Sequence, residues 1–407
     1  MPFQETCVLE ETMRFVLACL AGEESMTSLC EQFGISRQWG YELLRRYRAN
    51  GPAGLEPRSR APHCPGHAMP AEIAAAVIAL RGEHPSWGPK KLRAVLMRRA
   101  PETVWPAASS MGDLLRREGL VRSRRRRRVP LPLSRPFAAV EAPNDLWCID
   151  FKGWFRTRDG ERCDPLTLSD ADSRFLIACR AVSPVGAAVD DVTERAFRDY
   201  GLPRAMRSDN GPPFAGTGAG GLTRLAVKWL KLGIRLERTD PGAPQQNGRH
   251  ERMHATLKTE TAAPPAETLA AQQRRFDRFR AIYNHERPHE ALGQATPASR
   301  YQPSARRYPR RLEEPHYDAT HAVRRVRSNG EIRWGGDLIF LSETLVGEPV
   351  GIAETETGDW IVSFADVPLG RIDRRSKALR PFAPARPGRR KGGQEQTEKP
   401  VNDVPGP

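Results

Sequence analysis

The sequence lacks any run of about 20 consecutive apolar residues, which is the length that a membrane-spanning helix requires. Its first residues, MPFQETCVLEET, include acids and no basic stretch before an apolar segment, so no secretory signal is predicted there. Cysteine is scarce: the seven cysteines are an odd number and form no CxxC pair. A disulfide framework is therefore not expected, and we predict a protein of the reducing cytoplasm with no membrane partner.

Negative charge is also in short supply. The 407 residues include 64 Lys and Arg against 49 Asp and Glu, a formal net charge of +15. Basic side chains gain affinity for phosphates by releasing condensed counterions, so a nucleic acid is the natural partner. Charge alone leaves an anionic membrane surface as the alternative. The length favours several domains over one.

Residues 1–60 have the pattern of a helix-turn-helix DNA-binding domain. The segment MTSLCEQFGISRQWGYELLRRYRANG predicts a helix, a turn at Gly34 and a second helix that begins after Ser36 as its N-cap. Basic and amide side chains follow along this second helix, as a recognition helix in a major groove requires. The residues expected to contact DNA are Arg37, Gln38 and Arg45, with Arg46 and Arg48 on the same helix.

A second helical region is predicted over 70–122, with helices near 72–83, 90–98 and 108–118. Its turn, HPSWGPKKL, places Trp87 beside two lysines and favours a second helix-turn-helix. The alternative is an ordinary helical spacer. Residues 123–142 form a basic, proline-rich linker, in which we expect Arg124, Arg125, Arg126, Arg127 and Arg128 to contact DNA. A solvated run of charge is the alternative for these arginines.

The region 143–303 predicts a mixed α/β domain with one central sheet. LWCIDFKGW indicates a strand, LTLSDADSRFLIACRAV a hairpin, and VGAAVDDVTERAFRDYG an amphipathic helix. Further strands are expected at PRAMRS and IRLERT, and further helices at LTRLAVKWLKLG and RHERMHATLKTE.

The remainder is β-rich over 316–380, where a small antiparallel barrel or sheet is expected. AVRRVRSNGEIRW predicts a hairpin around Asn329–Gly330. The arginines around this turn favour a non-specific contact with DNA, and a solvated face is the alternative. Residues 381–407 have too few apolar side chains to fold and are predicted to be a disordered tail. The fold class is therefore multidomain: an all-α helix-turn-helix region, an α/β core and a small β-rich domain.

Three carboxylates in the central region occupy positions that suit a metal site. Asp150 lies at the end of an apolar strand, Asp209 follows the next central strand, and Glu251 lies in the first turn of a helix. Strand ends and a helix start can converge at one edge of a sheet. Hard oxygen ligands of this kind suit Mg²⁺ or Mn²⁺, and two such ions can catalyse an in-line phosphoryl displacement.

Five segments in order resemble one known family. LWCIDFKGWF, LSDADSRFL, RSDNGPPF, PGAPQQNGRHERMHATLK and YNHERPHEALGQATPASRY are similar to the integrase-core transposases of bacterial insertion sequences, which are relatives of retroviral integrase. The resemblance covers 143–303 and implies a ribonuclease-H-like core with a catalytic triad at Asp150, Asp209 and Glu251. The spacing from Asp209 to Glu251 is longer than in the best-known integrases.

The resemblance implies a transposase that cuts and joins DNA strands with two divalent metal ions, Mg²⁺ or Mn²⁺. It would recognise the terminal repeats of its element and a target DNA, act on the bacterial nucleoid, and assemble as at least a homodimer on DNA. The alternative is a catalytically inactive DNA-binding regulator with a helix-turn-helix.

Two competing patterns overlap the triad. His250-Glu251-Arg252-Met253-His254 matches the HExxH motif of zinc proteases, in which both histidines bind the metal. The basic charge and the missing third ligand pattern favour incidental histidines instead. Asp145, Asp170 and Asp172 are the nearest acids outside the triad, and the last two fall in a predicted turn.

Overall fold

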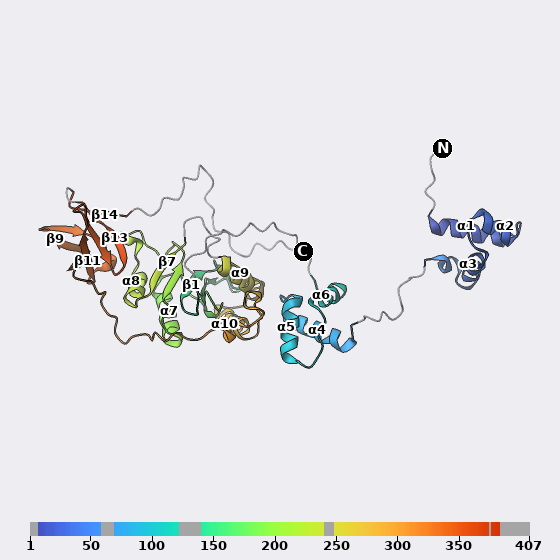
Figure 1. Ribbon diagram of the computed structural model, residues 1–407, viewed down its shortest axis with the longest axis horizontal. Coiled ribbons are helices and arrows are strands. Elements are labelled where there is room, and N and C mark those ends of the chain that lie inside the picture. Colours follow the sequence, from blue (N-terminus) through green and yellow to red (C-terminus); the bar gives the residue numbers. More distant parts are fainter. Residues whose placement is uncertain (1–6, 58–68, 122–139, 240–247, 374–375, 383–407) are drawn as a thin grey trace. The chain divides into compact units, whose positions relative to one another are not determined.

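The computed structural model describes residues 7–57, 69–121, 140–239, 248–373 and 376–382 (Figure 1). The chain forms two compact units, Met1–Pro70 and Ala71–Pro407. The predicted DNA contacts Arg124, Arg125, Arg126, Arg127 and Arg128 lie outside the described residues, as does the tail after residue 382. Within the described ranges, no helix has the length and apolar character needed to cross a bilayer, and the six cysteines are all free thiols.

The first unit is a three-helix domain with its own core. Its helices are α1 (Val8–Ala21), α2 (Met26–Gln32) and α3 (Arg37–Asn50), followed by the short η1 (Gly51–Leu55). The Ser36 hydroxyl accepts a hydrogen bond from the Trp39 amide, which confirms the predicted N-cap of α3. At Gly40 an added Cβ would lie 2.7 Å from Cys30 Sγ, so glycine is needed where α3 crosses α1 and α2.

The second helical region has its three helices close to the predicted positions: α4 (Ala71–Glu83), α5 (Pro89–Arg99) and α6 (Ala108–Arg117). Gly119, with φ of 68°, follows the end of α6 in the left-handed conformation that favours glycine. Trp87 in the HPSWGPKKL turn is buried and stacks on His84 with ring centroids 3.6 Å apart. Lys91 donates to the Pro288 carbonyl oxygen. Trp87 and Lys91 are therefore structural.

A five-stranded sheet forms the centre of the second unit. In chain order its strands are β1 (Leu146–Phe151), β4 (Pro165–Asp170), β5 (Leu176–Ala181), β6 (Ala205–Ser208) and β7 (Arg235–Arg238), and a two-stranded hairpin, β2 (Phe155–Arg156) and β3 (Arg162–Cys163), follows β1. The spatial order is β5-β4-β1-β6-β7. The hairpin β4–β5 and β1–β4 are antiparallel, whereas β1, β6 and β7 run parallel. The predicted mixed sheet is confirmed.

Helices cover both faces of this sheet (Figure 1). On one face lie α7 (Gly186–Tyr200) and α8 (Arg224–Lys231), and on the other lie α9 (Gly248–Leu257), its π-helical continuation η4 (Lys258–Ala262) and α10 (Leu269–His285). Short 3₁₀ turns occur at η2 (Ala219–Gly221), η5 (Glu290–Leu292) and η6 (Pro297–Ser299). Because strand side chains alternate, Ile149 enters the α7–α8 core while Asp150 belongs to the opposite face.

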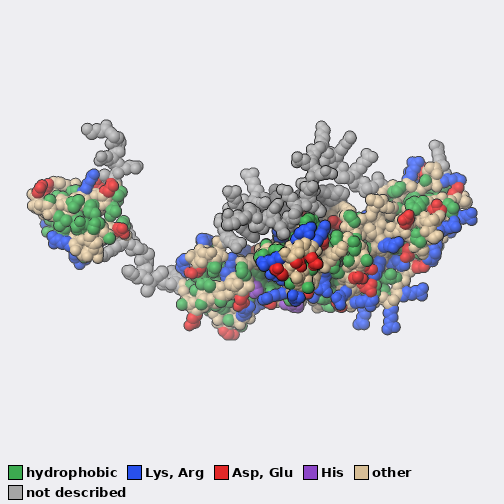
Figure 2. Space-filling view, turned by 180° about the vertical axis from the view of Figure 1, so that it is seen from behind, with side chains coloured by type: hydrophobic (Ala, Val, Ile, Leu, Met, Phe, Trp, Pro, Cys, Tyr) green, Lys and Arg blue, Asp and Glu red, His purple; other side chains and the backbone are tan. Residues whose placement is uncertain are grey.

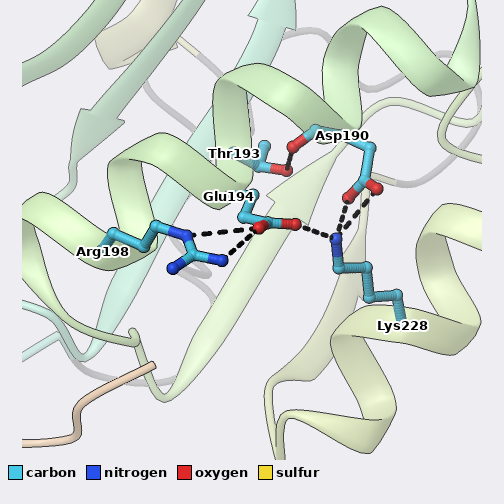
Figure 3. A network of polar contacts seen from close by, with 5 residues as sticks. All are labelled: Asp190, Thr193, Glu194, Arg198 and Lys228. Atoms are coloured by element: carbon cyan, nitrogen blue, oxygen red, sulfur yellow. Dashed lines mark hydrogen bonds and ion pairs between the residues drawn. The ribbon is translucent and has the colours of Figure 1, made fainter. Parts of the chain in front are cut away.

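An ion-pair network joins α7 to α8 (Figure 3). Lys228 of α8 places its ammonium 2.8 Å from Asp190 Oδ1 and 2.6 Å from Glu194 Oε2, both on α7. Arg198 donates to the other Glu194 oxygen at 2.6 Å. The hydrogen bond from Lys228, followed by that from Arg198, lowers the pKa of Glu194 to about 2.

The YNHERPHEAL segment ties α10 to the sheet and to the end of α9. The Asn284 amide makes a two-way clamp on the Leu176 backbone, accepting at 2.8 Å and donating at 2.9 Å. Arg287 forms a half-buried ion pair with Glu260 at 2.6 Å. This part of the family-like pattern therefore has a structural role.

The C-terminal region is strand-rich, as expected. Its strands are β8 (His321–Arg325), β9 (Glu331–Trp334), β10 (Asp337–Phe340), β11 (Pro349–Glu354), β12 (Trp360–Phe364), β13 (Val367–Ile372) and β14 (Leu379–Pro381), with a 3₁₀ turn at η7 (Glu343–Leu345). They form an antiparallel sheet of order β14-β13-β12-β11-β8 and a separate β9–β10 pair.

The predicted hairpin around Asn329–Gly330 is wrong. Both sides of this turn are strands, but β8 pairs with β11 and β9 pairs with β10. The turn itself forms, since the Arg327 amide donates to the Glu331 carbonyl at 2.8 Å. Beyond the turn the two strands separate, because β11 offers β8 a longer apolar partner strand. A turn signal fixes local geometry and leaves the choice of partner strand to the core.

The C-terminal sheet shares a hydrophobic core with α8 and η2. Buried side chains of β11 to β13 pack with Leu222, Val227 and Leu230 of the central region. Lys231 of α8 adds an ion pair with Glu348 at 2.7 Å. This small domain is therefore a packed part of the second unit.

Candidate active site and DNA-binding surface

Asp150 lies on the central strand of the sheet, on the face covered by α9. It pairs in register with Thr167 of β4, and its side chain is about one-fifth exposed. Burial, and after it the negative charges of Asp209 and Glu251, raise the pKa of the Asp150 carboxyl to about 7, against the opposing effects of the Phe151 amide and Lys152.

Asp209 is brought to the same edge by the parallel pairing of β1 with β6. Cys148 and Arg207 are partners in that register, and Asp150 and Asp209 each lie two residues farther along the chain. The Gly211 amide donates to Asp209 Oδ1 at 3.2 Å, in the turn that the Asn210–Gly211 pair predicts. Burial raises the pKa of Asp209 as well.

Glu251 lies in the first turn of α9 and is exposed. Met253 and Leu257 hold α9 in place, because both are buried against β5 and α10. The charge of Glu251 acts on Asp150, as the raised pKa of that carboxyl records. Glu251 is thus near enough to Asp150 for its charge to oppose ionisation of that carboxyl.

The two histidines of the HExxH pattern form a buried polar cluster, which the sequence does not predict. Nε2 of His250 and Nε2 of His254 each lie 2.7 Å from the Thr167 hydroxyl. Ser169 Oγ lies 3.1 Å from His250 Nδ1. Burial lowers the pKa of His250 to about 4 and that of His254 to about 2, so both rings are neutral at neutral pH.

This cluster corrects the expectation that the histidines are incidental, because they attach α9 to the strand beside Asp150. It also counts against the zinc-protease interpretation, which needs both histidines as ligands, since Thr167 and Ser169 contact the two ring nitrogens of His250. Ligand atoms of Asp150, His250 and His254 nevertheless lie within 4.8 Å of one another. The closest approach of Asp150 to a ring is 3.9 Å, from its Oδ2 to His254 Nδ1.

The competing acids are engaged in building the fold. Asp170 is buried at the other end of the β1–β4 ladder, where it accepts hydrogen bonds from the Asn144 amide and from the Ser173 amide and hydroxyl at 2.6–2.7 Å. Asp145 accepts from the amides of Glu141 and Ala142 and pairs with Arg204. Their hydrogen bonds assign both acids to turns.

The recognition-helix side chains divide into two groups. Arg37, Gln38 and Arg45 are exposed, and Arg45 makes an ion pair with Glu42 on its own helix. Arg46 is only 7% exposed and donates to the Glu56 carbonyl oxygen at 2.8 Å. The expectation that Arg46 faces DNA is wrong, because it lies among the core positions of α3, three residues after the buried Leu43.

Basic side chains elsewhere are spread across the surface with acids among them, in the view of Figure 2. In the β-rich region Arg325 pairs with Glu314, and Arg371 pairs with Asp359. Arg324 lies over the Trp334 ring at 5.3 Å. Several of the arginines considered for DNA contact therefore have partners within the chain.

Comparison with known proteins identifies the domain that contains these residues. Two models of the integrase core domain match residues 140–244 and 232–297, which together hold Asp150, Asp209 and Glu251. The central region of the chain is therefore an integrase core domain. Outside the core, a helix-turn-helix domain model matches residues 13–63, and a homeodomain-like domain model matches residues 39–115.

The relatives of this integrase-core chain include proteins of insertion elements. It is 29% identical over 232 residues to the insertion element IS407 uncharacterized 31.7 kDa protein of Burkholderia multivorans, covering 56% of this chain and 79% of the relative. It is 31% identical over 181 residues to the insertion element IS476 uncharacterized 39.2 kDa protein of Xanthomonas euvesicatoria, covering 44% of this chain and 50% of the relative.

Solved structures with some likeness to the integrase-core chain include two viral integrase cores. The catalytic core of BIV integrase is 22% identical, with a TM-score of 0.30, over 38% of this chain and 92% of that one. The HTLV-2 integrase catalytic core domain in complex with magnesium is 15% identical, with a TM-score of 0.31, over 39% and 97%.

Proposed function

We propose that this protein is a transposase that cuts DNA at the ends of an insertion element and joins those ends to a target. Two observations support it: the β1–β6 pairing brings Asp150 and Asp209 to one edge of the integrase core, and the charges of Asp209 and Glu251 both act on Asp150. Asp150 is held there although burial and its two acidic neighbours all oppose its charge. A fold retains such an arrangement where a cation completes it.

The donor set fits divalent metal. Three carboxylates supply hard oxygen ligands, and their mutual repulsion is relieved when a cation binds among them. We assign Asp150, Asp209 and Glu251 as the residues that would hold Mg²⁺ or Mn²⁺, as two ions. Such ions supply activation of the attacking oxygen and charge stabilisation of the leaving oxygen in a phosphoryl displacement.

The chain's own contribution is position. The parallel β1–β6 pair sets the spacing between the two aspartates, and α9 carries Glu251 in its first turn. Glu251 is exposed, so its carboxylate would be accessible to a DNA backbone. In the first unit, Arg37 and Gln38 stand at the start of α3, where side chains reach base edges in a major groove.

Transposition also requires two element ends to be held together, so we propose that the active species is at least a dimer on DNA. The linker between the N-terminal helical regions and the integrase core would add contacts with DNA phosphates, made by Arg124, Arg125, Arg126, Arg127 and Arg128.

The experiment is strand cleavage and joining on a DNA fragment that carries the element's end, in Mg²⁺. Asp150→Asn, Asp209→Asn and Glu251→Gln should each reduce both reactions by at least about 100-fold, while end binding in a gel-shift assay is kept. Asp172→Asn, at the far end of the β4 strand, is the matched control and should react like the wild type. A variant of the triad with near-normal activity would remove its residue from the site. A wild type that binds ends and never cuts them would support the inactive regulator instead.

A further inference from the structure

The Thr167 hydroxyl is the centre of the histidine cluster, and its hydrogen bonds can be counted. It donates to the Asp150 carbonyl oxygen at 3.1 Å and contacts Nε2 of His250 and of His254 at 2.7 Å. A hydroxyl has one hydrogen and two lone pairs. Because the hydrogen goes to the carbonyl, the two lone pairs must accept from both rings, and each ring carries its hydrogen on Nε2.

This count leaves both Nδ1 atoms as lone pairs, since a neutral imidazole has a single N–H. The Ser169 hydroxyl, 3.1 Å away, can donate to Nδ1 of His250. Nδ1 of His254 lies 3.9 Å from Asp150 Oδ2, so two hydrogen-bond acceptors face each other at a buried position. If Thr167 donated to His254 instead, Nδ1–H would point at Asp150 from a distance too long for a hydrogen bond.

We propose that His254, through Nδ1, is a ligand of the divalent cation that Asp150 binds through Oδ2. Adjacent ligand atoms of an octahedral ion with bonds of about 2.1 Å lie about 3 Å apart, so a small movement of the Asp150 side chain would let both residues hold one ion. The inference rests on the proposed function, to which it adds a nitrogen ligand. His250 is excluded from this role by the partners at both of its ring nitrogens.

The nitrogen ligand has a consequence for the choice of metal. Imidazole suits transition ions such as Fe²⁺, Ni²⁺ and Zn²⁺, Mn²⁺ is the weakest binder of that series, and Mg²⁺ strongly prefers oxygen. The site therefore binds Mn²⁺ in preference to Mg²⁺ by a margin that depends on His254. Thr167 contributes by holding the ring with Nδ1 turned toward Asp150.

The test is electron spin-echo envelope modulation of Mn²⁺ bound to the full-length protein, prepared with natural or ¹⁵N-labelled histidine. The wild type should show nitrogen modulation whose frequency changes with the label. His250→Gln should keep the modulation, and His254→Gln should lose it. In parallel titrations, His254→Gln should weaken Mn²⁺ binding at least about tenfold, and Mg²⁺ binding by less.

Each other result has a defined meaning. Mn²⁺ that binds the wild type, depends on Asp150, and shows no nitrogen modulation would overturn the role of His254 and leave the carboxylate site intact. Mn²⁺ binding that is indifferent to Asp150→Asn would count against the proposed function itself. Even if His254→Gln does not fold, the labelled wild type shows whether a histidine is a ligand of Mn²⁺.

Discussion

Two acidic clusters of the same domain have opposite electrostatics. On the α7–α8 side, Asp190 and Glu194 are satisfied by Lys228, and the pKa of Glu194 falls to about 2 (Figure 3). At the sheet edge, burial and then the charges of Asp209 and Glu251 raise the pKa of Asp150 to about 7. The first cluster contains its own cation and stabilises the fold. The second is the one that we propose as a metal site, and strongly shifted pKa values of this kind cluster at functional sites.

The largest expected effects come from one substitution in each of the two acidic clusters. Asp150→Asn should abolish strand cleavage and leave the melting temperature of the metal-free protein unchanged or higher, since it removes a repelled charge. Lys228→Met should lower the free energy of unfolding by about 1–3 kcal/mol, because it leaves two half-buried carboxylates without their partner. Its strand cleavage should persist at temperatures where it is folded.

Denaturant unfolding and the cleavage assay, run on both variants, measure the two halves of this comparison. Arg198→Met is the control for the α7–α8 network. Arg198 is mostly exposed, so this change should reduce stability much less than Lys228→Met does. A Lys228→Met protein as stable as the wild type would erase the distinction between the clusters.

The same distinction applies to two arginines of the recognition helix. Arg37→Ala should reduce the preference for element ends over random DNA by about tenfold, since a base contact contributes about 1–3 kcal/mol. Arg46→Ala should lower the melting temperature instead, because it removes the buried contact with Glu56. Competition binding and thermal unfolding of the full chain separate the two, and equal loss of specificity in both variants would contradict the assignment.

The smallest expected effect is on pH dependence. The pKa of Glu194 is lower in the folded chain than in the unfolded chain, so its stabilising contribution is present above about pH 4.5. It is lost as the pH falls toward 2. The stability difference between wild type and Lys228→Met should therefore narrow over this range. A difference that stays constant from pH 5 to the lowest pH at which the protein is folded would show that Glu194 is not the partner that matters.

Local chemistry in the sequence predicts much of the fold and singles out the three acids of the proposed site. The caps of α3, the strand β1 and the helix α9 follow from residue patterns that act over a few positions. Asp150 and Asp209 could be placed together because parallel strands present their ends at one edge.

What the sequence did not predict depends on contacts across long separations. Thr167 meets His250 and His254 more than 80 positions away, and no pattern within α9 names that partner. The pairing of β8 with β11, in place of β9 across the Asn329–Gly330 turn, also depends on a contact between distant segments. Arg46 had a local signal that could have been used, since its helical position continues the buried row of Leu43.

Iron-dependent cleavage of the chain itself tests the central claim most directly. Fe²⁺ placed in a Mg²⁺ site generates radicals that cut nearby backbone when ascorbate and peroxide are added. The account predicts fragments that end near residues 150, 209 and 251, suppressed by excess Mg²⁺, absent in Asp150→Asn and unchanged in Lys228→Met. Cuts that avoid these three places, or that persist in Asp150→Asn, would contradict it.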